Sequence, residues 1–540
     1  MAQHGFPDND LAMLFPTKSC AQRCSAFLHQ YNADINPSQI RVLSFVSTDP
    51  SGSACVKPRL SCVLFPKAIW PTAKSFWQHT GEGISSRRAE FCQLAFDQKT
   101  LVDATSISNS TLPIAKGPKR YQRTSVDNGY SKPIANGHVN GNGHVSKAGA
   151  NGAGMPDSVQ FVEERFGRNL DVAFATQAKL AIRRRIAGGL TSDAELPDSL
   201  DASDLSRQRS RDVPAFSVDD VYLYSCGMNA IFHAHLALKT AIREDQSVMY
   251  GFPYVDTLKI LQKFGTGALF YGHGNADDLD DLQRRLENGE RVLCLFCEFP
   301  SNPLLRSPDL QRIRALADQY DFAVVVDETI GNFLNIHVLP YADIVVSSLT
   351  KIFSGDSNVM GGSMILNPQS RFYRKLKDYL AHTYTDNHFE EDSIFLERNS
   401  RDFVSRIQRI NHNAELIAEV LLAHPEKIKQ VNYPKYSPTR HFYDACRLPE
   451  GGYGGLLSAT FHSLEDAESF YDALDTAKGP SLGTNFTLSS PFVLLAHYGE
   501  LHWAAEYGCE VNLVRFSVGL EDPTVLNEVF EKAIEAIPGR

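Results

Sequence analysis

Short apolar runs alternate with helix-like stretches from about residue 219 to 347, and this alternation limits the fold more than any other feature. Runs typical of buried strands lie at 221–224, 247–250, 268–271, 291–296, 322–326 and 343–347. Stretches of helical periodicity lie at 277–286 and 309–320. Strands that alternate with helices indicate a mostly parallel sheet with helices on both faces. The predicted fold class is α/β, with ligands expected at the carboxyl ends of the strands.

Composition divides the 540 residues into five predicted segments. The Gly- and Asn-rich stretch 121–156 cannot bury enough apolar surface to offset chain entropy, so it predicts a flexible linker. The other four segments are an N-terminal α+β extension (1–120), an arm (157–218), a large ligand-binding domain (219–395) and a small C-terminal domain (396–540).

Elements are also expected in the outer segments. The N-terminal extension is predicted to hold strands at 40–46 and 60–65 and a helix at 71–80. The C-terminal segment is predicted to hold helices at 401–422, 464–473 and 523–537, with strands at 456–461 and 514–518.

Charge and hydropathy exclude several classes of function. Lys and Arg total 53 against 63 Asp and Glu, a net charge of −10, which disfavours nucleic acid or an anionic membrane as the main partner. No window reaches the ~18 apolar residues of a membrane span. The first residues lack a basic segment followed by an apolar one, so we expect a cytoplasmic protein.

The cysteines and histidines point to no metal site. Ten cysteines in a chain of this length suit a reducing compartment. Cys294 and Cys297 form a CxxC, but they lie inside an apolar run, which favours a buried strand over a redox pair. Cys20 and Cys24 have no second ligand pair nearby. His233 and His235 are two apart on a predicted helix, so they do not share a face.

The segment Ser347–Gly362 carries the sharpest chemical signal. Lys351 follows a buried strand, two hydroxyl residues precede it, and a glycine-rich loop follows. A desolvated lysine can become a nucleophile that forms a covalent bond with a carbonyl cofactor. Ser348 and Thr350 can donate to a phosphate. A solvated lysine at a strand end is the simpler reading, and other residues weigh against it.

Four further strand ends carry matching groups. Asp327 ends an apolar strand, where a carboxylate is costly unless a cation such as a protonated pyridine nitrogen meets it. Gly227 opens an apolar helix whose amides can face a phosphate. Asn302 could bond a phenolic oxygen, and Tyr250 could stack on an aromatic ring. Together with Lys351, these residues predict a pyridoxal 5'-phosphate site.

With these motifs, the sequence resembles the Cys/Met-metabolism (γ-) family of fold-type-I pyridoxal-phosphate enzymes, in its fungal form. The resemblance runs from about residue 157 to the C-terminus, and the stretch 76–91 matches the fungal N-terminal extension. It implies a fold-type-I transferase in which Lys351 carries the cofactor and Asp327 pairs with its ring nitrogen.

The resemblance assigns further roles. Tyr250 would stack on the ring and assist proton transfer. The implied phosphate ligands are Gly227, Met228, Ser348 and Thr350, with Asn302 near the phenolic oxygen. Arg515 would grip the substrate α-carboxylate, for which a guanidinium fork is suited, and Ser481 would lie beside it.

Three positions depart from the family pattern. Phe166-Gly-Arg168 matches a motif that reaches the neighbouring subunit's phosphate, so Arg168 is retained while a tyrosine hydroxyl is lost. The loop 355–358 lacks the histidine and aspartate of bacterial relatives, and Cys226 replaces a serine. The resemblance also implies a homodimer or homotetramer.

The expected activity is γ-replacement on an O-acyl-L-homoserine, acetyl or succinyl, with L-cysteine, giving L-cystathionine in transsulfuration. The substrates would be small amino acids, with no nucleic acid or membrane partner. Four alternatives remain: sulfide as nucleophile, a carbon nucleophile in a specialised pathway, a γ-elimination lyase, and a non-catalytic regulatory protein on the same fold.

Overall fold

A computed structural model describes residues 10–48, 57–105, 174–188 and 210–538. Contacts divide the chain into one unit of residues 1–102 and 172–540 and a second of residues 103–171. The linker predicted at 121–156 lies outside the described residues, as do Phe166 and Arg168.

The central sheet has seven strands in the order β5-β11-β10-β9-β8-β6-β7. These strands are β5 (Val221–Tyr224), β6 (Gln246–Tyr250), β7 (Ala268–Tyr271), β8 (Val292–Glu298), β9 (Ala323–Asp327), β10 (Ile344–Ser348) and β11 (Gly362–Leu366). The strands from β10 to β7 are parallel, whereas β11 runs antiparallel to both β10 and β5. The predicted α/β class is therefore confirmed.

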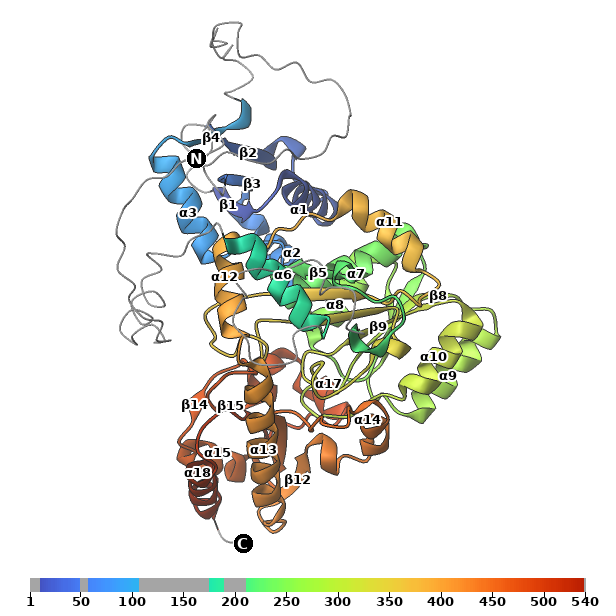
Figure 1. Ribbon diagram of the computed structural model, residues 1–540, viewed down its shortest axis with the longest axis vertical. Coiled ribbons are helices and arrows are strands. Elements are labelled where there is room, and N and C mark those ends of the chain that lie inside the picture. The colour runs from blue at the N-terminus through green and yellow to red at the C-terminus, as the bar shows by residue number, and fades with distance from the viewer. Residues whose placement is uncertain (1–9, 49–56, 106–173, 189–209, 539–540) are drawn as a thin grey trace, which may run out of the picture. The chain divides into compact units, whose positions relative to one another are not determined.

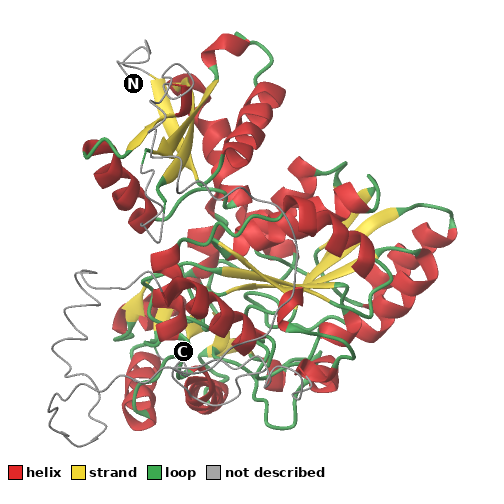
Figure 2. Ribbon diagram, turned by 45° about the horizontal axis from the view of Figure 1, so that its top comes forward, coloured by secondary structure: helices red, strands yellow, loops and turns green. Residues whose placement is uncertain are grey.

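Helices cover both faces of this sheet (Figures 1 and 2). They are α6 (Ala175–Ile186), α7 (Gly227–Ala241), α8 (Val255–Phe264), α9 (Ala276–Glu287), α10 (Leu310–Tyr320), α11 (Tyr373–Thr383) and α12 (Glu390–Asn399). One apolar core lies between the sheet and α7, α8 and α11. Strand residues outside this core, such as Leu295 and Val324, are buried as well, which is why the strands read as continuous apolar runs. Cys294 and Cys297 lie in β8 and are buried, as predicted.

The N-terminal residues form a separate four-stranded sheet in the order β1-β3-β2-β4. Its elements are β1 (Asp10–Phe15), α1 (Lys18–Tyr31), β2 (Arg41–Ser47), β3 (Arg59–Pro66), α2 (Trp70–Thr80), α3 (Ser86–Asp97) and β4 (Leu101–Asp103). The predicted strands and helix of this region are thus found within two residues of their expected bounds. We call residues 10–103 the N-terminal domain below.

A five-stranded sheet in the order β12-β13-β16-β15-β14 forms the C-terminal part. Its strands are β12 (Ile428–Asn432), β13 (Leu456–Phe461), β14 (Ala477–Lys478), β15 (Leu488–Ser490) and β16 (Leu513–Ser517). Its helices are α13 (Phe403–Leu422), α14 (Arg440–Cys446), α15 (Leu464–Ala473), α16 (Phe492–Ala496), α17 (Leu501–Glu506) and α18 (Pro523–Glu535). Short 3-10 helices lie at 37–39, 67–69, 210–212, 218–220, 339–341, 434–436 and 498–500.

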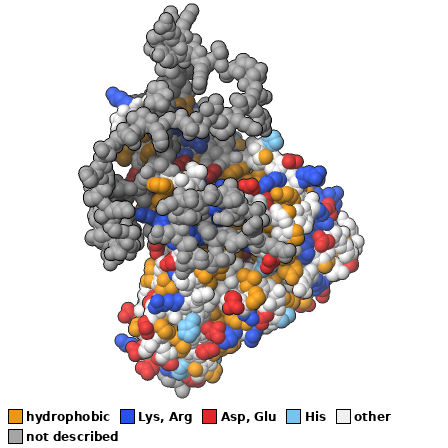
Figure 3. All heavy atoms as spheres, in the orientation of Figure 1, with side chains coloured by type: hydrophobic (Ala, Val, Ile, Leu, Met, Phe, Trp, Pro, Cys, Tyr) orange, Lys and Arg blue, Asp and Glu red, His pale blue; other side chains and the backbone are white. Residues whose placement is uncertain are grey.

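Two absences hold for the described part of the chain. None of its helices is both long enough and apolar enough to cross a bilayer. No group of three His, Cys, Asp or Glu side chains in it has the arrangement of a metal site. On the face drawn in Figure 3, acidic and basic side chains are interspersed over the described surface.

Candidate active site

The carboxyl ends of the parallel strands bring Asp327 and Lys351 to one edge of the sheet. Asp327 lies opposite Glu298 in the register of β9 and β8, and opposite Val346 in that of β9 and β10. Lys351 follows β10 by three residues. These strand ends therefore meet where a parallel sheet binds its ligands.

Lys351 points at the C-terminal sheet. Its Nζ donates to Ser481 Oγ at 2.9 Å. Gly483, at a φ of +71°, permits this approach, since a Cβ there would lie 2.4 Å from the backbone nitrogen of Ile352. Burial, and secondarily the charge of Arg515, lowers the pKa of Lys351 to about 8. A lysine in this state is a competent nucleophile near neutral pH.

The lowered pKa predicts early labelling of Lys351 by an amine-directed reagent when no ligand is bound. Since only the neutral amine reacts, modification should rise with pH and be half-complete near pH 8. An ordinary lysine reaches that point near pH ~10.4. Competitive labelling with acetic anhydride, read by peptide mass spectrometry against free lysine, measures this midpoint. A midpoint near that of free lysine would contradict the environment described here.

Arg515 lies on β16 and is 2% exposed. It donates to Asn302 Oδ1 at 3.0 Å and to the carbonyls of Pro480 and Ser481 at 2.7 and 2.8 Å. Burial lowers its pKa to about 10. None of the ion pairs among the described residues includes Arg515. A buried guanidinium without a carboxylate fits a carboxylate supplied by a ligand.

Asp327 is the counterpart carboxylate without a cation. It accepts from the backbone N–H of Thr329 at 2.8 Å, and the Thr329 hydroxyl accepts from the N–H of Ser348 at 2.8 Å. Removal from water raises the pKa of Asp327 to about 6. No ion pair within the described ranges contains Asp327. A protonated ring nitrogen of a ligand would supply the missing partner.

The start of α7 lies against the end of β10. A Cβ on Gly227 would lie 2.6 Å from that of Ser348, so only glycine allows this contact. No side chain caps the helix at Cys226, which leaves amides at its positive end for an anion. The structure therefore brings Gly227 and Ser348 together. The role of these two residues and of Met228 as phosphate ligands stays a prediction. The Thr350 hydroxyl is engaged with the backbone N–H and carbonyl of Gly361.

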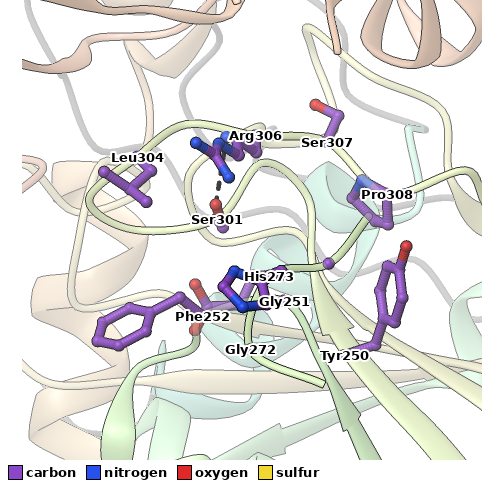
Figure 4. A pocket seen from close by; sticks show the side chains of 12 residues that line it. Tyr250, Gly251, Phe252, Gly272, His273, Ser301, Leu304, Arg306, Ser307 and Pro308 are labelled. Atoms are coloured by element: carbon purple, nitrogen blue, oxygen red, sulfur yellow. Dashed lines mark hydrogen bonds between the residues drawn. The ribbon is translucent and has the colours of Figure 1, made fainter. Parts of the chain in front are cut away.

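Tyr250 faces another part of the molecule. Its hydroxyl donates to the carbonyl of Asn275 at 2.8 Å, at the start of α9. The ring lines a cavity of about 20 Å³, which His273 and Arg306 also line. In Figure 4 the ring lies beside Pro308. The described contacts of Tyr250 thus lie away from Lys351, and its role toward the cofactor stays a prediction that these contacts do not support.

Tyr254 is better placed for that role, and the sequence reasoning missed it. Its N–H donates to Glu298 at 2.5 Å, and its hydroxyl interacts electrostatically with Arg515. The side chain is 45% exposed, so a ligand can reach the ring. The sequence does carry a signal for Tyr254. This residue lies in the loop after β6, and a side chain in such a loop can fold back over the strand end.

Glu298 was also missed. It is 8% exposed and accepts from the N–H groups of Tyr254 and Asn302, at 2.5 and 3.1 Å. Burial, and secondarily the charge of Asp327, raises its pKa to about 8. Glu298 therefore fixes the loop residues on both sides of the site, and Asn302 in turn holds Arg515.

The geometry fits pyridoxal phosphate. An electron-poor aromatic ring with a carbonyl, a ring nitrogen and a phosphate would meet Lys351, Asp327 and the start of α7 in turn. Arg515 would remain free for the carboxylate of an amino acid.

Comparisons with known proteins show the family of this chain. A family model described as "Cys/Met metabolism PLP-dependent enzyme" matches residues 216–535. A second, described as "Fungal trans-sulfuration enzyme, N-terminal domain", matches residues 1–85. The chain is 53% identical to the cystathionine gamma-synthase of Neurospora crassa, over 97% of this chain and 86% of that protein.

Two more similarities extend the comparison. The cystathionine gamma-synthase-like enzyme iboG2 of Amanita muscaria is 40% identical, over 98% of this chain and 86% of that protein. The crystal structure of yeast cystathionine gamma-lyase superposes with a TM-score of 0.54 at 23% identity, covering 66% of this chain and 98% of that one, which shows a shared fold. With a family match over more than half of its length, this chain belongs to the Cys/Met-metabolism family of pyridoxal-phosphate-dependent enzymes.

Proposed function

We propose that this protein catalyses γ-replacement on an O-acyl-L-homoserine with L-cysteine, giving L-cystathionine. The observation that carries the proposal is the convergence of Lys351 and Arg515 on one residue, Ser481, from two different sheets. A proton-transferring amine thus lies close to a buried carboxylate receptor, as α-amino-acid chemistry requires.

Arg515 binds the substrate. Its guanidinium is held by Asn302 and two carbonyls, so little side-chain entropy remains to be lost when a carboxylate arrives. A bidentate contact fixes the α-carbon of the amino acid relative to Lys351. Ser481, which already accepts from Lys351, orients the amine in the same region.

Lys351 moves the protons. Its pKa of about 8 lies near neutral pH, where an amine can both remove a proton and return it. When bound, pyridoxal phosphate accepts the electrons released at the substrate α-carbon. Asp327 holds a proton on the ring nitrogen, and Gly227, Met228, Ser348, Thr350, Asn302 and Arg168 are proposed to hold the rest of the cofactor.

The choice of cysteine is supported by the named relatives. The Neurospora crassa protein is called a cystathionine gamma-synthase, and this chain aligns with 86% of its length. The residues described above serve any γ-replacement, whereas the nucleophile is chosen by contacts that differ among relatives.

Product analysis tests the proposal. Purified protein loaded with pyridoxal phosphate would receive O-acetyl- or O-succinyl-L-homoserine, each with and without L-cysteine. We expect cystathionine by mass spectrometry only when cysteine is present, and the faster acyl donor identifies the natural one. Release of 2-oxobutyrate without cystathionine would contradict cysteine as the nucleophile and favour a lyase. Homocysteine formed only when sulfide is supplied would favour the sulfide alternative.

Assembly, location and domain division are proposed with the same function. We propose a homodimer or homotetramer in the cytoplasm, because Arg168 matches a family motif that reaches a neighbouring subunit. Light scattering during size-exclusion chromatography tests the assembly, and a monomer would contradict it. The five-segment division given by the sequence is kept as a proposal, to be tested by limited proteolysis.

A further inference from the structure

The end of α2 contacts the first turn of α8. Gln78 Nε2 donates to both carboxylate oxygens of Asp256, at 3.2 and 3.1 Å. His79 Nε2 lies 3.4 Å from Asp256 Oδ1. Both His79 and Asp256 are 5% exposed, so their contact is shielded from solvent. The N-terminal domain therefore fixes a carboxylate two residues beyond Tyr254.

Asp256 in turn interacts electrostatically with the Tyr254 side chain. Loss of solvent and, next, the charge of the nearby Asp256 carboxylate raise the pKa of the Tyr254 hydroxyl. The backbone of Tyr254 is fixed at its other end by Glu298. Hydrogen bonds thus link α2 to Asp256, and the charge of Asp256 in turn acts on the hydroxyl of Tyr254, which itself interacts with Arg515.

The next residues of the N-terminal domain contact the start of α7. The Gly81 carbonyl accepts from Ser225 Oγ at 3.1 Å and lies 3.7 Å from Cys226 Sγ. The Thr80 carbonyl accepts from Asn229 Nδ2 at 3.0 Å. Gly81 has a φ of +60°, and a Cβ there would lie 2.5 Å from Cys226 Sγ and 2.8 Å from the N–H nitrogen of Asn229. The contact has no room for a larger residue.

Glu82 anchors this segment. It is 2% exposed, accepts from Arg23 Nε at 2.9 Å, and lies 3.1 Å from Nε2 of His233 on α7. A cavity of about 210 Å³ lies beside the segment, lined by Gln78 and Gly81 on one side and by Cys226, Met228 and Tyr254 on the other. The same cavity thus borders the N-terminal domain, the start of α7 and Tyr254.

We propose that the Gln78–Glu82 segment of the N-terminal domain is a positioning element of the active site, which sets Tyr254 through Asp256 and the 225–228 loop through the Gly81 carbonyl. None of its residues is a catalytic residue, since none touches the reacting atoms. The role of Tyr254 in this proposal rests on the proposed function. The contact of the Gly81 carbonyl with residues 225–228 does not.

Cofactor affinity tests the contact between Gly81 and the start of α7. Gly81→Ala is expected to raise the Kd for pyridoxal phosphate at least about tenfold in cofactor-stripped protein, because Cys226 and Asn229 must move. Gly289→Ala is the matched control: its φ is also positive, at +89°, but nothing lies within 4 Å of its Cβ. Equal affinities of the two variants, with native circular dichroism, would overturn this part of the proposal. The measurement needs no substrate, so it is independent of which nucleophile the enzyme uses.

A double-mutant cycle tests the link between Asp256 and Tyr254. The readout is α-proton exchange of L-alanine in D2O, followed by NMR, which again requires neither acyl donor nor nucleophile. Asp256→Asn and Tyr254→Phe are each expected to slow exchange about tenfold or more, and the double variant should be no slower than Tyr254→Phe alone. His79→Leu should act in the same direction as Asp256→Asn. Additive losses would show that Asp256 acts on stability rather than through the Tyr254 hydroxyl, and would overturn the proposal.

Discussion

Replacement of Lys351 by alanine is expected to reduce cystathionine formation by about 10⁴-fold, the upper end of what a positioned proton-transfer group contributes. The amine lies 2.9 Å from Ser481 Oγ with a pKa of about 8, and no other lysine is described near this group. Loss of the side chain removes both the covalent attachment and the group that moves protons, so no neighbour can substitute for it.

Two measurements separate these roles. Borohydride reduction followed by peptide mass spectrometry should find the cofactor mass on residue 351 of the natural protein and on no residue of the variant. Steady-state assays should show the loss in turnover. Lys375→Ala is the control, since Lys375 is exposed on α11. Retention of more than about a tenth of the activity by Lys351→Ala would disprove the assignment.

The parallel part of the fold could be predicted because its signals are local. β6, β8, β9 and β10 are buried on both faces, so each is a continuous apolar run. β11 was not predicted, because Gly361 precedes it, Gly362 begins it, and its partners are β5 and β10. Its antiparallel pairing with β5 joins residues 221–224 to residues 362–365, and no pattern within a short window encodes that pairing.

The site could be predicted where a residue type is chemically unusual for its position. A lysine and an aspartate at the ends of buried strands, and an arginine within one, are such cases, and the structure places Lys351 and Arg515 on a shared serine. Tyr250 and Tyr254 show where prediction of the site from the sequence fails. Both are aromatic and near one strand end, and only the bond from Tyr250 to Asn275 shows that Tyr250 turns toward α9.

The contribution of the N-terminal domain could not be predicted either. Gln78, His79 and Asp256 are ordinary residues in their own segments, and they form a site only because α2 packs on α7 and α8. The contact joins residues 178 apart in sequence. Contacts between distant segments leave no periodic pattern in the sequence of either segment. For this reason no site residue was predicted in the N-terminal extension.

Arg515→Lys is expected to lower kcat/KM for the amino-acid substrate roughly 150-fold, which corresponds to a loss of about 3 kcal/mol in interaction free energy. A loss of this size is in the range for truncating one partner of a buried charge pair. Lysine keeps the positive charge, so the electrostatic effect of residue 515 on Lys351 is largely preserved. What it loses is the planar fork, which at Arg515 is held by Asn302 Oδ1 and two backbone carbonyls. The loss should therefore fall mainly on KM, with the affinity for pyridoxal phosphate unchanged.

Steady-state kinetics at varied O-acyl-L-homoserine, alongside cofactor titration, distinguish the outcomes. Arg440→Lys is the control, because Arg440 forms an exposed pair with Asp444 and its replacement should change neither constant. A fall in kcat at constant KM would instead assign Arg515 to the orientation of Ser481 and Lys351. That result would contradict a carboxylate clamp, because an interaction present in both the bound substrate and the transition state must appear in KM.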